Sequence, residues 1–180
     1  MNITGGKFNS RKVTAPDSDK VRPTLSKIRE SVFNMLSSLI EFENSIFLDA
    51  FSGSGIMSLE AISRGFKKVI SVEKDFKTAK IIKENFALIG LEPNLIIKDV
   101  IKALDIIEDK FDVIYLDPPY KNIELYNKTL KKIADNKILN EKGIIVVESQ
   151  KGTEYEIPED FSLIKEKTYG DTIIRILFFK

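Results

Sequence analysis

The stretch Val113-Ile114-Tyr115-Leu116-Asp117-Pro118-Pro119-Tyr120 joins an apolar run to a rigid, polar and aromatic corner. The apolar run is rich in β-branched residues and predicts a buried strand. Two successive prolines exclude both a continued central strand and an immediate helix. Asp117 and Tyr120 are therefore expected on a stiff loop at the end of a strand, which is where α/β proteins bind ligands.

Strand and helix patterns alternate regularly around this stretch. Apolar runs predict strands at 46–50, 69–72, 95–97, 112–116 and 143–148. Apolar spacing, capping residues and glycine stops predict helices at 54–64, 76–89, 100–107 and 123–134, after a first helix with Thr24 as N-cap and apolar positions 25, 28, 32, 36 and 39. Repeated units of this kind predict a doubly wound α/β fold with a parallel core sheet of order 3-2-1-4-5.

Both ends of the chain depart from this alternation. Residues 2–14 predict two short strands around Gly5 and Gly6, and residues 161–167 and 172–179 predict an antiparallel hairpin added to the sheet. A chain of 180 residues with 43% hydrophobic content suits one core. We therefore expect a basic β-hairpin arm over residues 1–23 and one domain over residues 24–180.

Composition excludes several kinds of chemistry. The chain has no cysteine and no histidine, so it can build no disulfide, no thiolate nucleophile and no histidine general base, and a metal site is not expected. The net charge is only +1, but residues 1–30 hold seven cations against three anions, a local balance of +4. This segment is either a solvated arm or a surface for phosphates. Lacking a leader pattern or a long apolar window, the chain is expected in the cytoplasm.

A glycine-rich turn follows the first core strand, at Leu48-Asp49-Ala50-Phe51-Ser52-Gly53-Ser54-Gly55. Glycines let the backbone approach a ligand, and the following helix offers free N–H groups. A turn without a ligand is the plainer alternative. A dinucleotide fingerprint is disfavoured because its third glycine would fall at Ser58. We expect cofactor contacts from Asp49, Phe51, Ser52, Gly53 and Gly55.

Acidic residues follow the next two strands. Glu73 can accept hydrogen bonds from both ribose hydroxyls of a nucleoside ligand, since Asp75 is better placed to cap the next helix. Asp99 could contact an adenine amine or simply cap the short helix that follows. Glu60 and Arg64 have the spacing of an ordinary helix pair and are assigned a structural role.

Several motifs together resemble the S-adenosylmethionine-dependent methyltransferases that modify guanine N2 in 16S ribosomal RNA. These motifs are Gly5-Gly6-Lys7-Phe8, Arg22-Pro23-Thr24, Arg29-Glu30-Ser31, Leu59-Glu60-Ala61, Ser63-Arg64-Gly65, Val72-Glu73-Lys74, Asp117-Pro118-Pro119-Tyr120 and Tyr169-Gly170-Asp171-Thr172. The resemblance implies a Rossmann-like class I fold, with a seven-stranded sheet and an antiparallel C-terminal strand. It also implies S-adenosylmethionine as cofactor, with further contacts from Lys74, Asp99, Val100 and Asp117. An adenine-N6 DNA methyltransferase is the alternative, because enzymes of that kind share the Asp-Pro-Pro-Tyr sequence.

The resemblance also implies roles in catalysis and substrate binding. The catalytic corner would comprise Asp117, Pro118, Pro119 and Tyr120, in which Asp117 and the Pro118 carbonyl accept hydrogen bonds from the target amine and Tyr120 stacks on the extruded base. Phosphate contacts are expected from Lys7, Arg11, Lys12 and Arg22. Arg29 is expected either at the RNA or near the active site. The expected partner is ribosomal RNA or the assembling small subunit, and the protein is expected to be a monomer.

Overall fold

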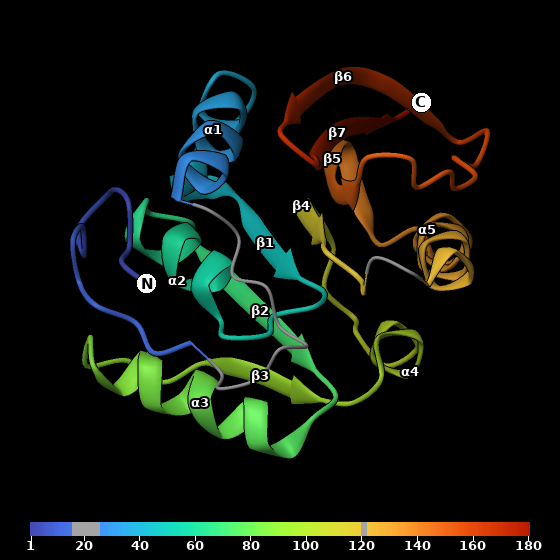
Figure 1. The fold of residues 1–180 in the computed structure, drawn as a ribbon. Coiled ribbons are helices and arrows are strands. Elements are labelled where there is room, and N and C mark those ends of the chain that lie inside the picture. The colour runs from blue at the N-terminus through green and yellow to red at the C-terminus, as the bar shows by residue number, and fades with distance from the viewer. Residues whose placement is uncertain (16–25, 120–121) are drawn as a thin grey trace.

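The computed structural model describes residues 1–15, 26–119 and 122–180 (Figure 1). The helices are α1 (Ser26–Ser37), η1 (Phe42–Asn44), α2 (Ile56–Ser63), α3 (Phe76–Ala87), α4 (Val100–Leu104) and α5 (Ile123–Asn136). The strands are β1 (Ile46–Asp49), β2 (Lys68–Glu73), β3 (Asn94–Ile97), β4 (Phe111–Leu116), β5 (Leu139–Gln150), β6 (Phe161–Tyr169) and β7 (Thr172–Phe179). The helices and strands predicted between residues 26 and 180 are confirmed, with ends that differ by a few residues.

The strands form one seven-stranded sheet of order β3-β2-β1-β4-β5-β7-β6. Neighbouring strands from β3 to β5 run parallel, while β7 pairs antiparallel with both β5 and β6. The predicted order 3-2-1-4-5 and the antiparallel C-terminal strand are therefore confirmed. The order reverses between β1 and β4, which creates the switch point where such sheets bind ligands.

Helices cover both faces of the sheet (Figure 1). One hydrophobic core joins side chains of α1, α2 and α3 to one face, with Phe33, Phe47 and Phe66 at its centre. The other core joins α4 and α5 to the opposite face. Because side chains alternate between faces along a strand, the apolar strand positions divide between these two cores.

The arm differs from the predicted hairpin. Its ends meet at an isolated antiparallel bridge between Asn2 and Lys12, and no strand forms in residues 1–15. Left-handed backbone at Gly6 (φ 75°) and Ser10 (φ 67°) interrupts the extended geometry that a ladder needs. One donor that a strand would use is bonded elsewhere, since the Lys7 N–H donates to the carbonyl of Ser63 in α2 at 2.7 Å.

Two expectations for the first helix have different outcomes. The cap predicted at Thr24 and the apolar position at Leu25 lie outside the described residues. Ile28, Val32 and Leu36 are buried as the spacing predicted. Leu39 is 43% exposed, contrary to the predicted apolar face, because α1 ends at Ser37 and the chain turns away before reaching it.

Candidate active site

Four carboxylates gather at the carboxyl ends of four neighbouring strands. Glu73 ends β2, Asp49 ends β1, Asp117 directly follows β4, and Glu148 lies near the end of β5. These strands are adjacent in the order β2-β1-β4-β5. The core under α1, α2 and α3 contains Phe47, Tyr115 and Val146, which lie two positions before Asp49, Asp117 and Glu148. Because residues two apart on a strand point to the same side, the three carboxylates share that face of the sheet. We call these four side chains the carboxylate row.

The charges of the carboxylate row affect one another. Burial raises the pKa of Asp117 well above its usual range, and the negative charges of Glu148 and then Asp49 raise it further. Burial also raises the pKa of Asp49 to about 6, against hydrogen bonds from Ser58 that lower it, and the charge of Glu73 adds to the increase. Such a site favours a cation.

Asp49 is held by the helix that follows it. It is 1% exposed, and its Oδ2 accepts hydrogen bonds from the backbone N–H of Ser58 at 3.1 Å and from the Ser58 hydroxyl at 2.7 Å. The Ser58 hydroxyl also lies 2.8 Å from that of Ser71 on β2. Among the described residues, Asp49 Oδ1 has no hydrogen-bond partner. A buried, unpaired carboxylate oxygen is costly and typical of functional sites.

The glycine turn has the backbone shape that the sequence predicted. Gly53 (φ 52°) and Gly55 (φ 77°) both adopt left-handed backbone. A Cβ on Gly55 would also lie 3.2 Å from Cγ2 of Ile82 on α3, so this position must stay small. The hydroxyl of the buried Ser52 donates to the Asp49 carbonyl at 2.9 Å, which ties the turn to the end of β1.

The sequence suggested that Glu73 is free to bind a ligand, but in the structure it is bonded to this turn. Its Oε2 accepts from the Gly53 N–H at 3.1 Å, and its Oε1 accepts from the Asp75 N–H at 2.8 Å. Asp75 caps α3 as predicted, accepting from the Thr78 N–H at 2.8 Å. Each Glu73 oxygen keeps a second lone pair, and the side chain is partly exposed, so hydroxyl groups of a ligand can still bind it.

The remaining predicted cofactor residues follow the strands β1, β2 and β3. Asp99 caps α4, accepting from the Ile101 N–H at 3.0 Å, which is the structural alternative that the sequence left open. Val100 is buried in the core under α4. Phe51 is half-buried and Lys74 is exposed.

The proline corner and the glycine turn lie at neighbouring strand ends. β1 and β4 pair in parallel with Asp49 opposite Tyr115, and the Ala50 N–H donates to the Tyr115 carbonyl at 3.0 Å. The two loops that follow are therefore side by side at the switch point. Tyr120 lies outside the described residues. Sequence reasoning missed Glu148, although an acidic residue at the end of a buried apolar run could have indicated it.

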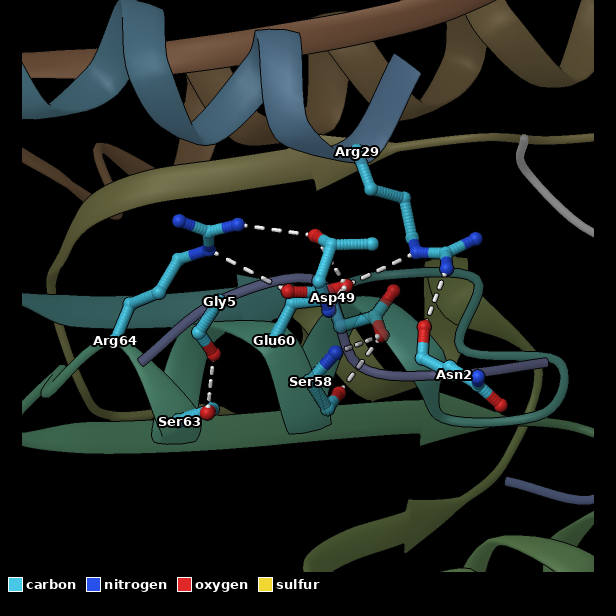
Figure 2. Close-up of polar contacts among 9 residues, drawn as sticks. Asn2, Gly5, Arg29, Asp49, Ser58, Glu60, Ser63 and Arg64 are labelled. Carbon is cyan, nitrogen blue, oxygen red and sulfur yellow. Dashed lines mark hydrogen bonds and ion pairs between the residues drawn. The ribbon is translucent and has the colours of Figure 1, made fainter. Parts of the chain in front are cut away.

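A second buried carboxylate fixes the arm (Figure 2). Glu60 on α2 is fully buried and accepts hydrogen bonds from the backbone N–H and the hydroxyl of Thr4, both at 2.8 Å. It also pairs with Arg29 of α1 at 3.1 Å and with Arg64 at 3.4 Å. Arg29 in turn donates to the Asn2 carbonyl at 2.7 Å. We call this set the arm clamp.

The arm clamp bears on two expectations. Glu60 and Arg64 form the helix pair with a structural role that the sequence predicted, and the structure adds that Glu60 has no exposed area and also serves Arg29 and the arm. Arg29 is 2% exposed and is enclosed between α1, α2 and the arm, so the structure does not place it on a surface for RNA. Lys7, Arg11 and Lys12 are exposed on the arm, and Arg22 lies outside the described residues.

No group of His, Cys, Asp or Glu side chains that could hold a metal ion occurs among residues 1–15, 26–119 and 122–180. No helix within those ranges is long and apolar enough to cross a membrane.

Comparison with known proteins assigns the chain to a family. The family described as "Conserved hypothetical protein 95" matches residues 1–178. "Ribosomal RNA small subunit methyltransferase D" of Haemophilus influenzae is 32% identical over 98% of this chain and 92% of its own, and the Escherichia coli protein of that name is 29% identical over 98% and 88%.

A solved structure agrees with this assignment. The "Putative methyltransferase yhhF" of Escherichia coli superposes with a TM-score of 0.86 at 27% identity, covering 100% of this chain and 98% of that one. The resemblance to ribosomal RNA methyltransferases predicted from the sequence is thereby confirmed. The chain belongs to the Conserved hypothetical protein 95 family and is related over nearly its whole length to proteins named ribosomal RNA small subunit methyltransferase D.

Proposed function

We propose that this protein is an S-adenosylmethionine-dependent methyltransferase that modifies the exocyclic N2 amine of a guanine in 16S ribosomal RNA. One observation carries the proposal. The Asp117-Pro118-Pro119 corner and the Gly53 to Gly55 turn end adjacent strands at the switch point, with Asp117 inside the carboxylate row. A cofactor lying on the turn would therefore meet a base amine held at the corner.

The residues present fit S-adenosylmethionine, whose sulfonium supplies a transferable methyl group when the cofactor is bound. The Glu73 oxygens retain lone pairs suited to ribose hydroxyls, and the unpartnered Oδ1 of Asp49 offers a further acceptor. The left-handed Gly53 and Gly55 leave the backbone open to close approach. The carboxylate row makes the site negative, which suits a cationic cofactor.

The corner can orient a base amine. The lone pair of such an amine is delocalised into the ring, so the nitrogen is a weak nucleophile. Asp117 and the Pro118 carbonyl would accept the two N–H groups and direct the lone pair toward the methyl group. Positioning and electrostatics then supply the rate, and the proton released after transfer passes to Asp117 or to water.

The arm supports a nucleic acid substrate. Lys7, Arg11 and Lys12 are exposed on a segment whose backbone is bonded to α2, so they form a fixed basic surface suited to phosphates. Ribosomal RNA as substrate follows from the names of the relatives, and guanine N2 follows from the sequence motifs. We propose 16S RNA or an assembling small subunit as the partner.

One assay tests the proposal. The protein is incubated with methyl-labelled S-adenosylmethionine and 16S RNA, assembling subunits or DNA, and the modified nucleoside is identified after digestion. We expect N2-methylguanosine from the RNA substrates. Asp117→Ala should abolish most transfer and reduce cofactor affinity far less than it reduces transfer, and Asp135→Asn, at an exposed site on α5, should match the wild type. N6-methyladenine in DNA, or cofactor binding without transfer, would overturn the proposal.

A further inference from the structure

The two prolines of the corner create a structural problem. Neither Pro118 nor Pro119 has a backbone N–H, so the corner cannot be held by donating into the sheet. Their carbonyls remain acceptors. The Pro119 carbonyl accepts from the Asn122 N–H at 2.9 Å, which closes a tight turn into α5. Pro118 is buried, and a buried carbonyl without a hydrogen-bond donor is costly. The Pro118 carbonyl therefore needs a donor from another part of the chain.

Tyr126 supplies that donor from the first turn of α5. Its side chain is fully buried, and its hydroxyl lies 3.3 Å from the Pro118 carbonyl and 3.0 Å from the Glu148 carbonyl. A phenol has one proton, so these two acceptors share it. The hydroxyl thus connects the corner to the adjacent strand β5, whose position is set by the sheet.

Strand β5, which carries the Glu148 carbonyl, is itself held in place. Tyr115 on β4 donates its phenol proton to the Glu148 carboxylate, and both side chains are 1% exposed. Glu148 is therefore bonded through its carboxylate to the strand before the corner and through its carbonyl to the helix after it. This arrangement restricts the corner from both sides.

We propose that Tyr126 is a positioning residue that fixes the Pro118 carbonyl for the hydrogen bond to the target amine. The inference rests on the proposed function, since it concerns the same amine. The carbonyl oxygen has two lone pairs, and Tyr126 occupies one while the other stays available. A preorganised acceptor needs no rearrangement as the amine becomes the nucleophile.

The chain offers a matched control. The Tyr155 ring stacks on the Tyr126 ring with centroids 4.9 Å apart at 11°. Within the described residues, no hydrogen bond joins the Tyr155 hydroxyl to Pro118 or Glu148. Tyr126→Phe and Tyr155→Phe therefore remove the same group from one stacked pair, and only the first touches the corner.

The experiment compares these variants in the methyl transfer assay. Tyr126→Phe should lower kcat by about tenfold to a hundredfold, without changing the dissociation constant of S-adenosylmethionine. Tyr155→Phe should keep the wild-type kcat. Amide exchange at Asn122, followed by NMR, supplies a readout independent of activity. The exchange should accelerate in Tyr126→Phe and stay unchanged in Tyr155→Phe, because that amide is bonded to the neighbouring carbonyl.

The outcomes separate two failures. Equal kcat values and equal Asn122 exchange in the two variants would overturn the role of Tyr126, whatever the substrate. A parallel loss of melting temperature and kcat in both variants would also overturn it, since packing would then explain the effect. If the wild type transfers no methyl group to RNA, the proposed function fails, while the exchange data still decide whether Tyr126 orders the corner.

Discussion

Asp117 lies beside Glu148 at the ends of two neighbouring parallel strands, one step beyond the paired residues Leu116 and Val147. The negative charge of Glu148 contributes to a raised pKa of Asp117, after burial. The group proposed to accept the amine hydrogen bonds therefore ionises at a higher pH than an ordinary aspartate. This relationship leads to the first prediction.

Replacing Glu148 with Gln should shift the pH dependence of methyl transfer. An ionised Asp117 accepts hydrogen bonds from the amine more strongly than a protonated one and can take up the released proton, so activity should fall as pH decreases through its raised pKa. The amide removes the neighbouring charge and keeps an acceptor for the Tyr115 hydroxyl. The acid limb of the kcat profile should consequently move to lower pH. A limb at the same pH in both proteins would contradict the coupling.

Replacing Asp49 with Asn should stabilise the protein most at neutral pH. The pKa of Asp49 is raised from 3.8 to about 6 in the folded state, so the folded protein binds this proton more tightly than the unfolded chain. Stability is therefore lost as pH rises from about 4 to about 6, by up to about 3 kcal/mol, and stays constant above. Asn avoids this loss. The difference in free energy of unfolding between variant and wild type should grow from about pH 4 to about pH 7, measured by urea denaturation.

The same variant should bind S-adenosylmethionine more weakly, measured by calorimetry at neutral pH, because one negative charge of the carboxylate row is removed. Greater stability together with weaker binding would identify Asp49 as a residue retained for function. A stability difference that is independent of pH would contradict the raised pKa.

Replacing Glu60 with Gln should destabilise the fold. The change leaves two arginines without their buried counter-charge, and removing one partner from a buried ion pair costs about 3–5 kcal/mol. The control is Glu84→Gln, which removes an exposed helix pair with Lys80 at 3.8 Å and should cost less than about 0.5 kcal/mol. Denaturant unfolding measures both. Similar costs in the two variants would show that the arm clamp contributes little.

Removing the exposed arm cations should reduce the salt dependence of RNA binding. The slope of log affinity against log salt is negative. In the triple variant Lys7→Ala, Arg11→Ala, Lys12→Ala we expect its magnitude to decrease by about 0.7–0.9 for each phosphate that is no longer neutralised. The control triple, Lys83→Ala, Lys128→Ala, Lys131→Ala, removes equal charge from exposed positions on α3 and α5 and should keep most of the slope. Equal slopes in the two triples would make the arm structural.

Local patterns predicted what depends on neighbouring residues. The apolar run that ends at Leu116, the Asp75 cap and the glycines after β1 each report a backbone requirement within a few positions, and each is observed. The arm does not form the predicted hairpin because its backbone bonds to α2 as well as to itself, which no local pattern indicates.

The sequence by itself determined the proline corner and the glycine turn, because periodicity and turn chemistry are local properties. The repeated strand–helix alternation determined the strand order, and motifs along the whole chain determined the family. Only the tertiary structure decided which charges meet. Glu60 and Arg29 are 31 residues apart and Asp117 and Glu148 are also 31 apart, so their partnerships arise when distant elements pack side by side. Burial then changes what each charge can do, since a carboxylate out of water needs a partner or a proton.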